Sequence, residues 1–128
     1  MSKRKILNTD KAPAAIGPYN QAVKAGKTLY VSGQIPLIPE TMDLVESGIA
    51  DETHQVLKNV GAILENAGYG FEDVVKASIF LSDMTNFAVV NEIYAQYFTE
   101  NQPARECVAV KTLPKNVNVE ISVIAWKG

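Results

Sequence analysis

The sequence predicts a single α+β domain in which two helices pack on one face of a mixed β-sheet. Three observations support this prediction. The chain has 128 residues, which fits one domain. Two segments repeat apolar residues at helical spacing, and the segments around them have the composition and alternation of strands. The predicted order is β-β-α-β-α-β-β over residues 1–128, arranged as a two-layer sandwich.

The first patterned segment is a β-hairpin with its turn at residues 25–27. Two short apolar runs flank this turn, as expected for two antiparallel strands. Alternation divides the second run between two faces, with Leu29, Val31 and Gly33 on one and Tyr30, Ser32 and Gln34 on the other. An additional short strand is possible near residues 5–7.

Two amphipathic helices are predicted. Ser47 could cap the first helix, whose apolar residues recur at steps of three and four as far as Ala67. Gly68 is placed to end this helix in the left-handed conformation. Thr85 could cap the second helix, which turns six apolar or aromatic residues inward: Phe87, Val90, Ile93, Tyr94, Tyr97 and Phe98.

The remaining strands are predicted at residues 73–83, 103–110 and 117–126. Two helices can cover only one face of such a sheet. If the strands are in register, the other face carries six residues of mixed character: Tyr30, Ser32, Cys107, Ala109, Ile124 and Trp126. This face is too apolar for free exposure to water, so we expect another subunit to cover it.

Composition argues against several classes of function. The formal net charge is -2, without the basic stripe of a nucleic-acid-binding protein, so we expect no nucleic-acid partner. No apolar run reaches the roughly 18 residues of a membrane span, and the N-terminus has no apolar signal core. We therefore expect no membrane association and a cytoplasmic location. One histidine and one cysteine nearly exclude a zinc site, and no glycine-rich phosphate-binding motif supports a nucleotide cofactor.

Arg105 is the most unusual residue of the strand at 103–110, where alternation places it on one face with Cys107 and Ala109. A buried charge must be paired, and the planar guanidinium suits a carboxylate. Either a bound carboxylate or a salt bridge within or between subunits would satisfy it. Cys107 has no nearby histidine to activate it, which favours a packing role. His54 is expected on the solvated side of the first helix.

Glu120 interrupts an apolar strand. A partly buried glutamate can have a raised pKa and exchange protons with a bound water near neutral pH. Structural pairing with an arginine or with backbone amides explains it equally well. Tyr19 follows a Gly-Pro turn that could present its hydroxyl at the rim of a cleft, or the ring could simply pack. Gly33 lies inside a strand, which indicates a bulge or the close approach of a ligand to the backbone.

The chain resembles the RidA (YjgF) family of reactive-imine deaminases along essentially its whole length. The matching stretches include APAAIGPYNQAV, LYVSGQIP, PARECVAV and LPKNVNVEISVIA. The resemblance implies a chorismate-mutase-like fold and a homotrimer with its sites in clefts between subunits. It also implies cofactor-free hydrolysis of 2-imino and enamino acids, such as 2-aminoacrylate and 2-aminocrotonate, to 2-keto acids and ammonia.

The resemblance also assigns roles to individual residues. Arg105 is similar to the residue that binds the substrate carboxylate, and Glu120 to the residue that positions or activates water. Five further residues match positions in or near the pocket: Tyr19, Ser32, Gly33, Asn91 and Cys107. The same cleft could instead bind a 2-keto acid or an amino acid without turnover, as a regulatory module. A ribonuclease activity has also been attached to relatives, and the mild acidity of this chain argues against it.

Two residues depart from the family pattern. Glu106 follows the arginine where a small or apolar residue is usual. Strand alternation is expected to point its side chain away from Arg105, whereas a bulge would let the two pair. Gln102 stands where an aromatic residue often precedes Pro103, which puts the shape of one cleft wall in question.

Overall fold

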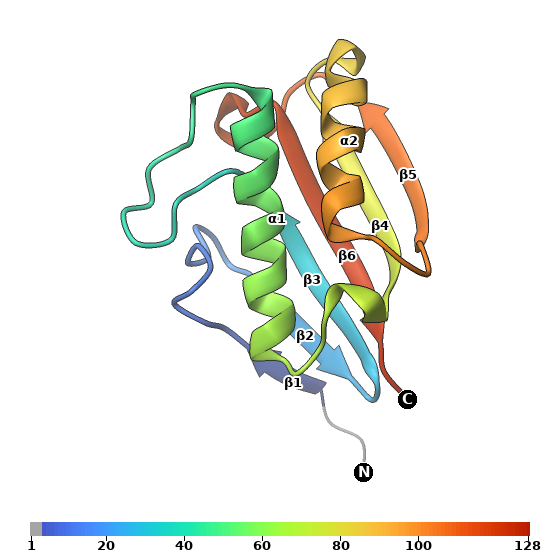
Figure 1. Ribbon diagram of the computed structural model, residues 1–128. Coiled ribbons are helices and arrows are strands. Elements are labelled where there is room, and N and C mark those ends of the chain that lie inside the picture. The colour runs from blue at the N-terminus through green and yellow to red at the C-terminus, as the bar shows by residue number, and fades with distance from the viewer. Residues whose placement is uncertain (1–3) are drawn as a thin grey trace.

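The computed structural model describes residues 4–128, which form a six-stranded mixed sheet with both helices on one face (Figure 1). The predicted fold class is confirmed, and the short strand near residues 5–7 is present. Along the sheet the order is β1-β2-β3-β6-β4-β5. The elements are β1 (Arg4–Leu7), β2 (Ala22–Ala25), β3 (Thr28–Gln34), α1 (Ile49–Asn66), β4 (Val74–Leu81), α2 (Phe87–Tyr97), β5 (Ala104–Ala109) and β6 (Val119–Trp126). Among the strands of residues 4–128, only β4 and β5 pair in parallel.

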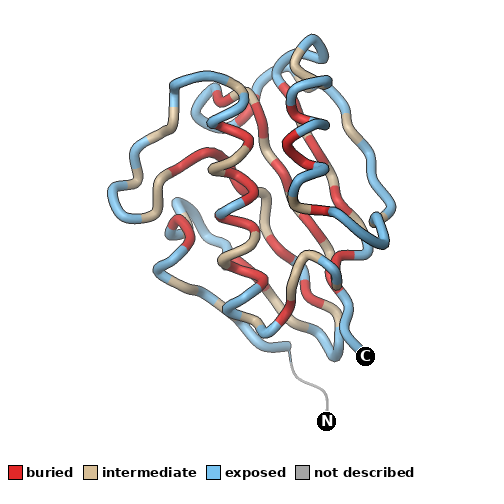
Figure 2. Tube along the Cα trace, viewed as in Figure 1, coloured by how far each residue is buried: buried red, intermediate tan, exposed pale blue. Residues whose placement is uncertain are grey.

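Helix α1 packs against β3 and β6 and buries a continuous apolar stripe (Figure 2). The helix begins after Gly48, which is the N-cap residue, so the predicted cap at Ser47 is wrong. Ser47 precedes the cap position by one residue, and its hydroxyl donates to Asp51 Oδ2 at 2.7 Å. Gly68 follows the helix with a φ of +80°, as predicted. Within the part of the chain that the structure describes, no helix is long and apolar enough to cross a membrane.

Helix α2 packs beside α1 on the β4–β5 side of the sheet (Figure 1). The predicted cap at Thr85 is wrong, because a short 3₁₀ turn at residues 84–86 precedes the helix. Asp83 is the N-cap residue of that turn, and its carboxylate accepts a hydrogen bond from the Thr85 backbone N–H at 2.8 Å. His54 is half-buried rather than solvated, since its Nδ1 lies 2.8 Å from the Tyr97 hydroxyl and joins the two helices.

The alternation of β4 decides which residues of β5 face the helices. Ala77 and Ile79 of β4 are fully buried beneath the helices. In the parallel register Arg105 lies beside Ala77, and Cys107 lies beside Ile79. Neighbouring residues in register point to the same side of a sheet. Arg105 and Cys107 therefore share the helix-covered face.

The predicted placement of Cys107 and Ala109 on the open face is wrong. That placement required the alternation of β5 to be in phase with β3 and β6, whereas the register with β4 places Glu106 and Val108 on the open face instead. The prediction is confirmed for Tyr30 and Trp126, the two largest of the six residues expected on the open face, because Tyr30 is 50% exposed and Trp126 is 52% exposed. The open face therefore combines exposed apolar side chains with polar ones such as Ser78 and Glu106, and neither helix covers it.

Gly68 provides a test of the backbone conformation that ends α1. A Cβ at this position would meet nothing within 4 Å, so Gly68→Ala adds only left-handed backbone strain. We expect the free energy of unfolding to fall by about 1–2 kcal/mol, measured by urea unfolding at fixed chain concentration. Gly17 has no positive φ and only ordinary contacts near its Cβ position, so Gly17→Ala should not share this loss. Equal losses of stability in Gly68→Ala and Gly17→Ala would contradict the left-handed conformation assigned to Gly68.

Candidate active site

A cavity of about 400 Å³ opens between the N-terminal loop, the end of β3 and the start of β6. A few polar residues reach it: Tyr19, Ser32, Gln34 and Glu120. The rest of the lining is apolar and comes from Pro13, Ala14, Ile16, Ile35, Leu37 and Pro114 together with the backbone at Gly33. Apolar walls with a few convergent polar groups are typical of a small-molecule site.

The loop that carries Tyr19 is held in place by Gln21, whose side chain is 2% exposed. Its amide nitrogen donates to the carbonyl oxygens of Thr9 and Pro13, and its amide oxygen accepts from the Thr9 backbone N–H. Sequence analysis did not identify Gln21, because a polar residue at the start of a short strand gives no sign that it is buried. Its hydrogen bonds fix the cavity wall and leave Tyr19 at the rim, 45% exposed.

A bulge in β3 brings Gly33 against Glu120. The pairing of β3 with β6 shifts between Val31 and Gln34, which confirms the bulge indicated by the strand glycine. A Cβ at Gly33 would overlap the Glu120 carboxylate, so only glycine leaves this space free. The bulge also turns Gln34 inward, where it is 5% exposed. The predicted sharing of a face by Gln34 and Tyr30 is therefore wrong.

Glu120 is half-buried, and its register with Phe80 places its side chain on the open face of the sheet. Burial raises the pKa of its carboxyl above the ordinary value of 4.5, because the charged form loses hydration. Among residues 4–128 no hydrogen bond or ion pair reaches this carboxylate. Pairing within the chain, which the sequence left open, is therefore not what holds Glu120. A carboxyl of this kind is suited to proton exchange with a bound water.

Arg105 lies exposed at the edge of the sheet, beside α2. Its Nη1 donates to Asn91 Oδ1 at 2.7 Å, and its Cζ lies 4.9 Å from the centre of the Tyr94 ring. No carboxylate within the described chain forms a salt bridge with it. An internal salt bridge therefore does not account for Arg105, and its charge remains available to a ligand or to another chain.

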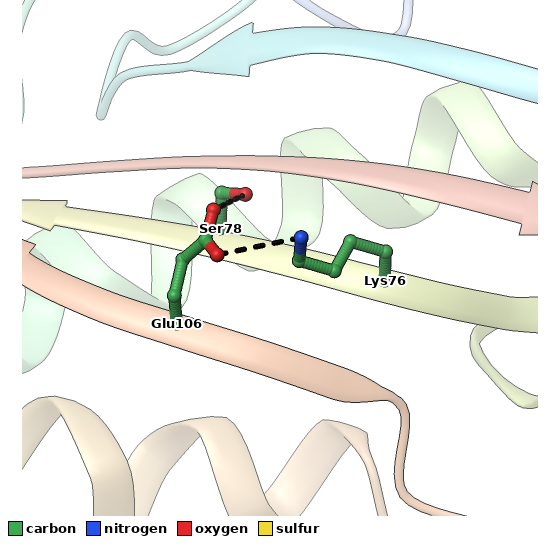
Figure 3. A network of polar contacts seen from close by, with 3 residues as sticks. All are labelled: Lys76, Ser78 and Glu106. Atoms are coloured by element: carbon green, nitrogen blue, oxygen red, sulfur yellow. Dashed lines mark hydrogen bonds and ion pairs between the residues drawn. The ribbon is translucent and has the colours of Figure 1, made fainter.

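Glu106 points to the opposite side of the sheet from Arg105, as expected from alternation, and its polar contacts lie on that side (Figure 3). Its carboxylate lies 3.3 Å from Lys76 Nζ and accepts a hydrogen bond from the Ser78 hydroxyl at 3.1 Å. Gln102 donates from its side-chain amide to the Phe98 carbonyl at 2.6 Å, which ties the strand entry to the end of α2. Neither departure from the family pattern neutralises Arg105.

Cys107 packs partly against the hydrophobic core. Burial raises the pKa of its thiol, and the nearby Arg105 charge only partly offsets this effect. A raised pKa keeps the sulfur in its weakly nucleophilic thiol form. The structure therefore agrees with a packing role for Cys107.

The predicted site residues fall into two groups within one chain. One group lines the cavity and comprises Tyr19, Ser32, Gly33 and Glu120. The other lies at the β5 edge and comprises Asn91, Arg105 and Cys107. Strand β4 separates β5 from β6, and Arg105 and Glu120 project from opposite faces of the sheet. A ligand of a few atoms cannot contact both groups of the same chain.

Comparison with known proteins places the chain in a family. Residues 9–127 match the family described as Endoribonuclease L-PSP. The 2-iminobutanoate/2-iminopropanoate deaminase of Mus musculus is 50% identical over 125 residues, which are 98% of this chain and 93% of the relative. The chain belongs to this family, which is the RidA (YjgF) family that its motifs resemble.

Solved structures support the same assignment and the fold. YyfA of Yersinia pestis, from the conserved Rid protein family, has a TM-score of 0.95 and 48% identity, over 98% of this chain and 100% of that chain. TdcF of E. coli with bound serine has a TM-score of 0.93 and 42% identity, over 97% of this chain and 99% of that chain.

Glu120→Gln tests the raised pKa through the pH dependence of stability. A carboxyl whose pKa is higher in the folded than in the unfolded chain favours folding below its unfolded pKa, and this contribution is lost as pH rises through the folded pKa. The glutamine variant never becomes charged. Its free energy of unfolding should exceed that of the wild type at pH 7, and the difference should vanish below pH 4, as measured by urea unfolding at each pH.

Two controls complete this experiment. Glu40 lies exposed outside the cavity, so Glu40→Gln accounts for the general loss of one carboxylate. Repeating the measurement with Arg105→Ala removes any charge that a second copy of the chain brings to Glu120. In this background, Arg105→Ala is compared with the double variant Arg105→Ala/Glu120→Gln. If Arg105→Ala alone is the more stable of the two at pH 7, the raised pKa of Glu120 is contradicted.

Proposed function

We propose that this protein hydrolyses reactive 2-imino and enamino acids, such as 2-aminoacrylate and 2-aminocrotonate, to 2-keto acids and ammonia. Four mammalian relatives at 49–50% identity carry the name 2-iminobutanoate/2-iminopropanoate deaminase. The observation that carries the proposal is a pair of charged groups, neither of which has a partner of opposite charge within residues 4–128. Arg105 has no carboxylate partner within the described chain, and Glu120 has a raised pKa beside an apolar cavity. The first suits a substrate carboxylate, and the second suits proton transfer.

The proposed site lies between two subunits of a homotrimer. Arg105 and Glu120 are on opposite faces of one sheet, so they can meet only if the β5 edge of one subunit closes the cavity of its neighbour. The open face offers a surface for this contact, because Tyr30, Val108 and Trp126 are each about half exposed. Head-to-tail contacts around a closed ring would give every cleft one Arg105 and one Glu120. We infer that the ring has three subunits from the family resemblance.

The reaction needs few groups from the protein. Arg105 would hold the substrate carboxylate through charged hydrogen bonds, each worth about 1.5–3 kcal/mol. The enamine gains a proton at C3, the carbon of its C=C bond that does not carry nitrogen, and becomes the iminium. A water beside Glu120 then adds to the iminium carbon while Glu120 accepts one proton from that water, which gives a neutral carbinolamine. Glu120 returns this proton to nitrogen, and it accepts the hydroxyl proton as the C–N bond breaks, so that ammonia and the keto acid are released and the last proton passes to solvent. Such acid–base assistance is typically worth about 10²–10⁴ in rate.

The remaining residues would shape the cleft. Tyr19 and the Gly33 backbone amide would contact the substrate from the cavity side, and Cys107 would form part of the wall on the β5 side. The Ser32 hydroxyl already donates to the Asn20 carbonyl at 2.6 Å, so Ser32 would act as a wall residue and an acceptor. We propose a small-molecule carboxylate as the substrate, no nucleic-acid or membrane partner, and action in the cytoplasm.

A coupled assay tests the activity. A threonine or serine dehydratase supplies the imine, and the release of keto acid is followed with and without this protein. We expect release to exceed the spontaneous rate, and Arg105→Ala to abolish the acceleration because the carboxylate loses its anchor. Arg4, on the exposed strand β1, is the only other arginine of the chain, so Arg4→Ala is the matched control and should retain activity.

The outcomes separate the competing functions. No acceleration by the wild type would reject the deaminase. Binding of 2-ketobutyrate by calorimetry without acceleration would favour a regulatory binding protein. Cleavage of RNA that persists in Arg105→Ala would instead support the nuclease named in the family description.

Mixing two inactive variants tests whether the site is shared between chains. Arg105→Ala and Glu120→Gln chains are unfolded, mixed in equal amounts and refolded together. If each cleft takes Arg105 from one subunit and Glu120 from another, random assembly restores both residues in about a quarter of the clefts. The expected activity is thus about 25% of that of refolded wild type, whereas a site within one chain predicts none. Each variant refolded alone provides the baseline.

A further inference from the structure

We infer that Phe87, Asn91 and Tyr94 of α2 form an arginine cradle, which holds the guanidinium of Arg105 in the orientation that receives a carboxylate. The inference rests on the proposed function, and it gives Asn91 a role toward Arg105 rather than toward the substrate. The three residues are four and three positions apart, so they share one face of the helix. Helix α2 lies beside β5, which carries Arg105 (Figure 1).

The contacts of the cradle restrict the guanidinium in two ways. The Cζ of Arg105 lies 4.9 Å from the ring centre of Tyr94 and 5.8 Å from that of Phe87, within the range of cation–π attraction. The hydrogen bond from Nη1 to Asn91 Oδ1, at 2.7 Å, then fixes the rotation of the planar group. Arginine has five N–H donors, so this bond leaves the others free for a bidentate contact with a carboxylate.

The cradle is rigid because Tyr94 is anchored in the core. Tyr94 is 4% exposed, and its ring stacks on Phe98 with centroids 4.2 Å apart and an interplanar angle of 18°. A platform that does not move limits the number of orientations available to the arginine before the substrate arrives. Preorganisation of this kind increases affinity by reducing the entropy lost on binding.

The chemistry of residue 91 also matters, because an amide can orient the arginine without neutralising it. A carboxylate at this position would form a salt bridge with Arg105 and compete with the substrate. The carboxylate nearest in sequence, that of Glu106, is kept on the opposite face by Lys76 and Ser78. The cradle therefore holds Arg105 through neutral groups alone.

Steady-state kinetics test the cradle in the coupled assay. Arg105 binds the carboxylate equally in the ground state and the transition state, so loss of its orientation should act on KM. We expect Asn91→Ala to raise KM roughly tenfold with kcat changed less than about twofold, and Asn91→Asp to raise KM further. Gln96→Ala removes another amide from an exposed position of α2 and is the matched control. A fall in kcat at unchanged KM, or a weaker effect of aspartate than of alanine, would overturn the inference.

A double-mutant cycle separates an effect through Arg105 from direct contact with the substrate. The dissociation constant of 2-ketobutyrate is measured for Asn91→Ala, for Arg105→Lys and for the double variant. If Asn91 acts through the arginine, the alanine substitution should have little further effect once lysine replaces Arg105. A full, additive loss in the double variant would show that Asn91 binds the ligand itself and would reject the cradle.

A measurement independent of activity distinguishes failure of the cradle from failure of the proposed function. The chain has two arginines, so their side-chain N–H signals can be assigned by NMR with Arg105→Lys. Rotation of the Arg105 guanidinium should be slow in the wild type and in Tyr94→Phe, which keeps the aromatic face. It should be faster in Asn91→Ala and in Tyr94→Leu. Equal rotation in all four proteins would reject the cradle, whereas slow wild-type rotation without imine turnover would reject only the deaminase.

Discussion

The two helices cover one face of the sheet, and the role open to each polar residue depends on the face from which it projects. The pairing of β4 with β5 places Arg105 on the helix face, beside buried Ala77. The pairing of β4 with β6 places Glu120 on the open face, beside Phe80. One backbone pattern therefore orients the arginine toward a supporting helix and the glutamate toward the open face, where it borders the cavity. The separation of the two groups is a consequence of the pleat and not of a flexible loop.

The sequence was sufficient for the class of fold because periodicity reports burial directly. The apolar stripe of α1, the turn at Gly26 and the left-handed Gly68 each follow from local chemistry. Candidate site residues could also be selected from the sequence, since Arg105 and Glu120 are charged residues in strands that are otherwise apolar or small. A charge in such a strand requires a partner, and this requirement is visible without knowing the fold.

Relations between strands could not be predicted in the same way. Alternation shows that Arg105 and Cys107 share a face, but it does not say which face, because that depends on the register with β4. The bulge at Gly33 had the same consequence for Gln34, whose direction reversed within one strand. Gln21 was missed because its burial results from a loop folding back over it. In each case the missing information was a contact between distant parts of the chain.

The position of Arg105 would meet two opposing demands on the carboxylate receptor that we propose. A central strand would bury the guanidinium and require a compensating anion, which would occupy the site. A free surface would leave the side chain hydrated and mobile, at a cost in entropy when the substrate binds. At the edge strand β5, one side of the arginine rests on Tyr94 and Asn91 while the other remains open. An edge position with a neutral support therefore keeps the charge both ordered and unpaired, and in the homotrimer that we propose it would face the Glu120 carboxyl of a second subunit.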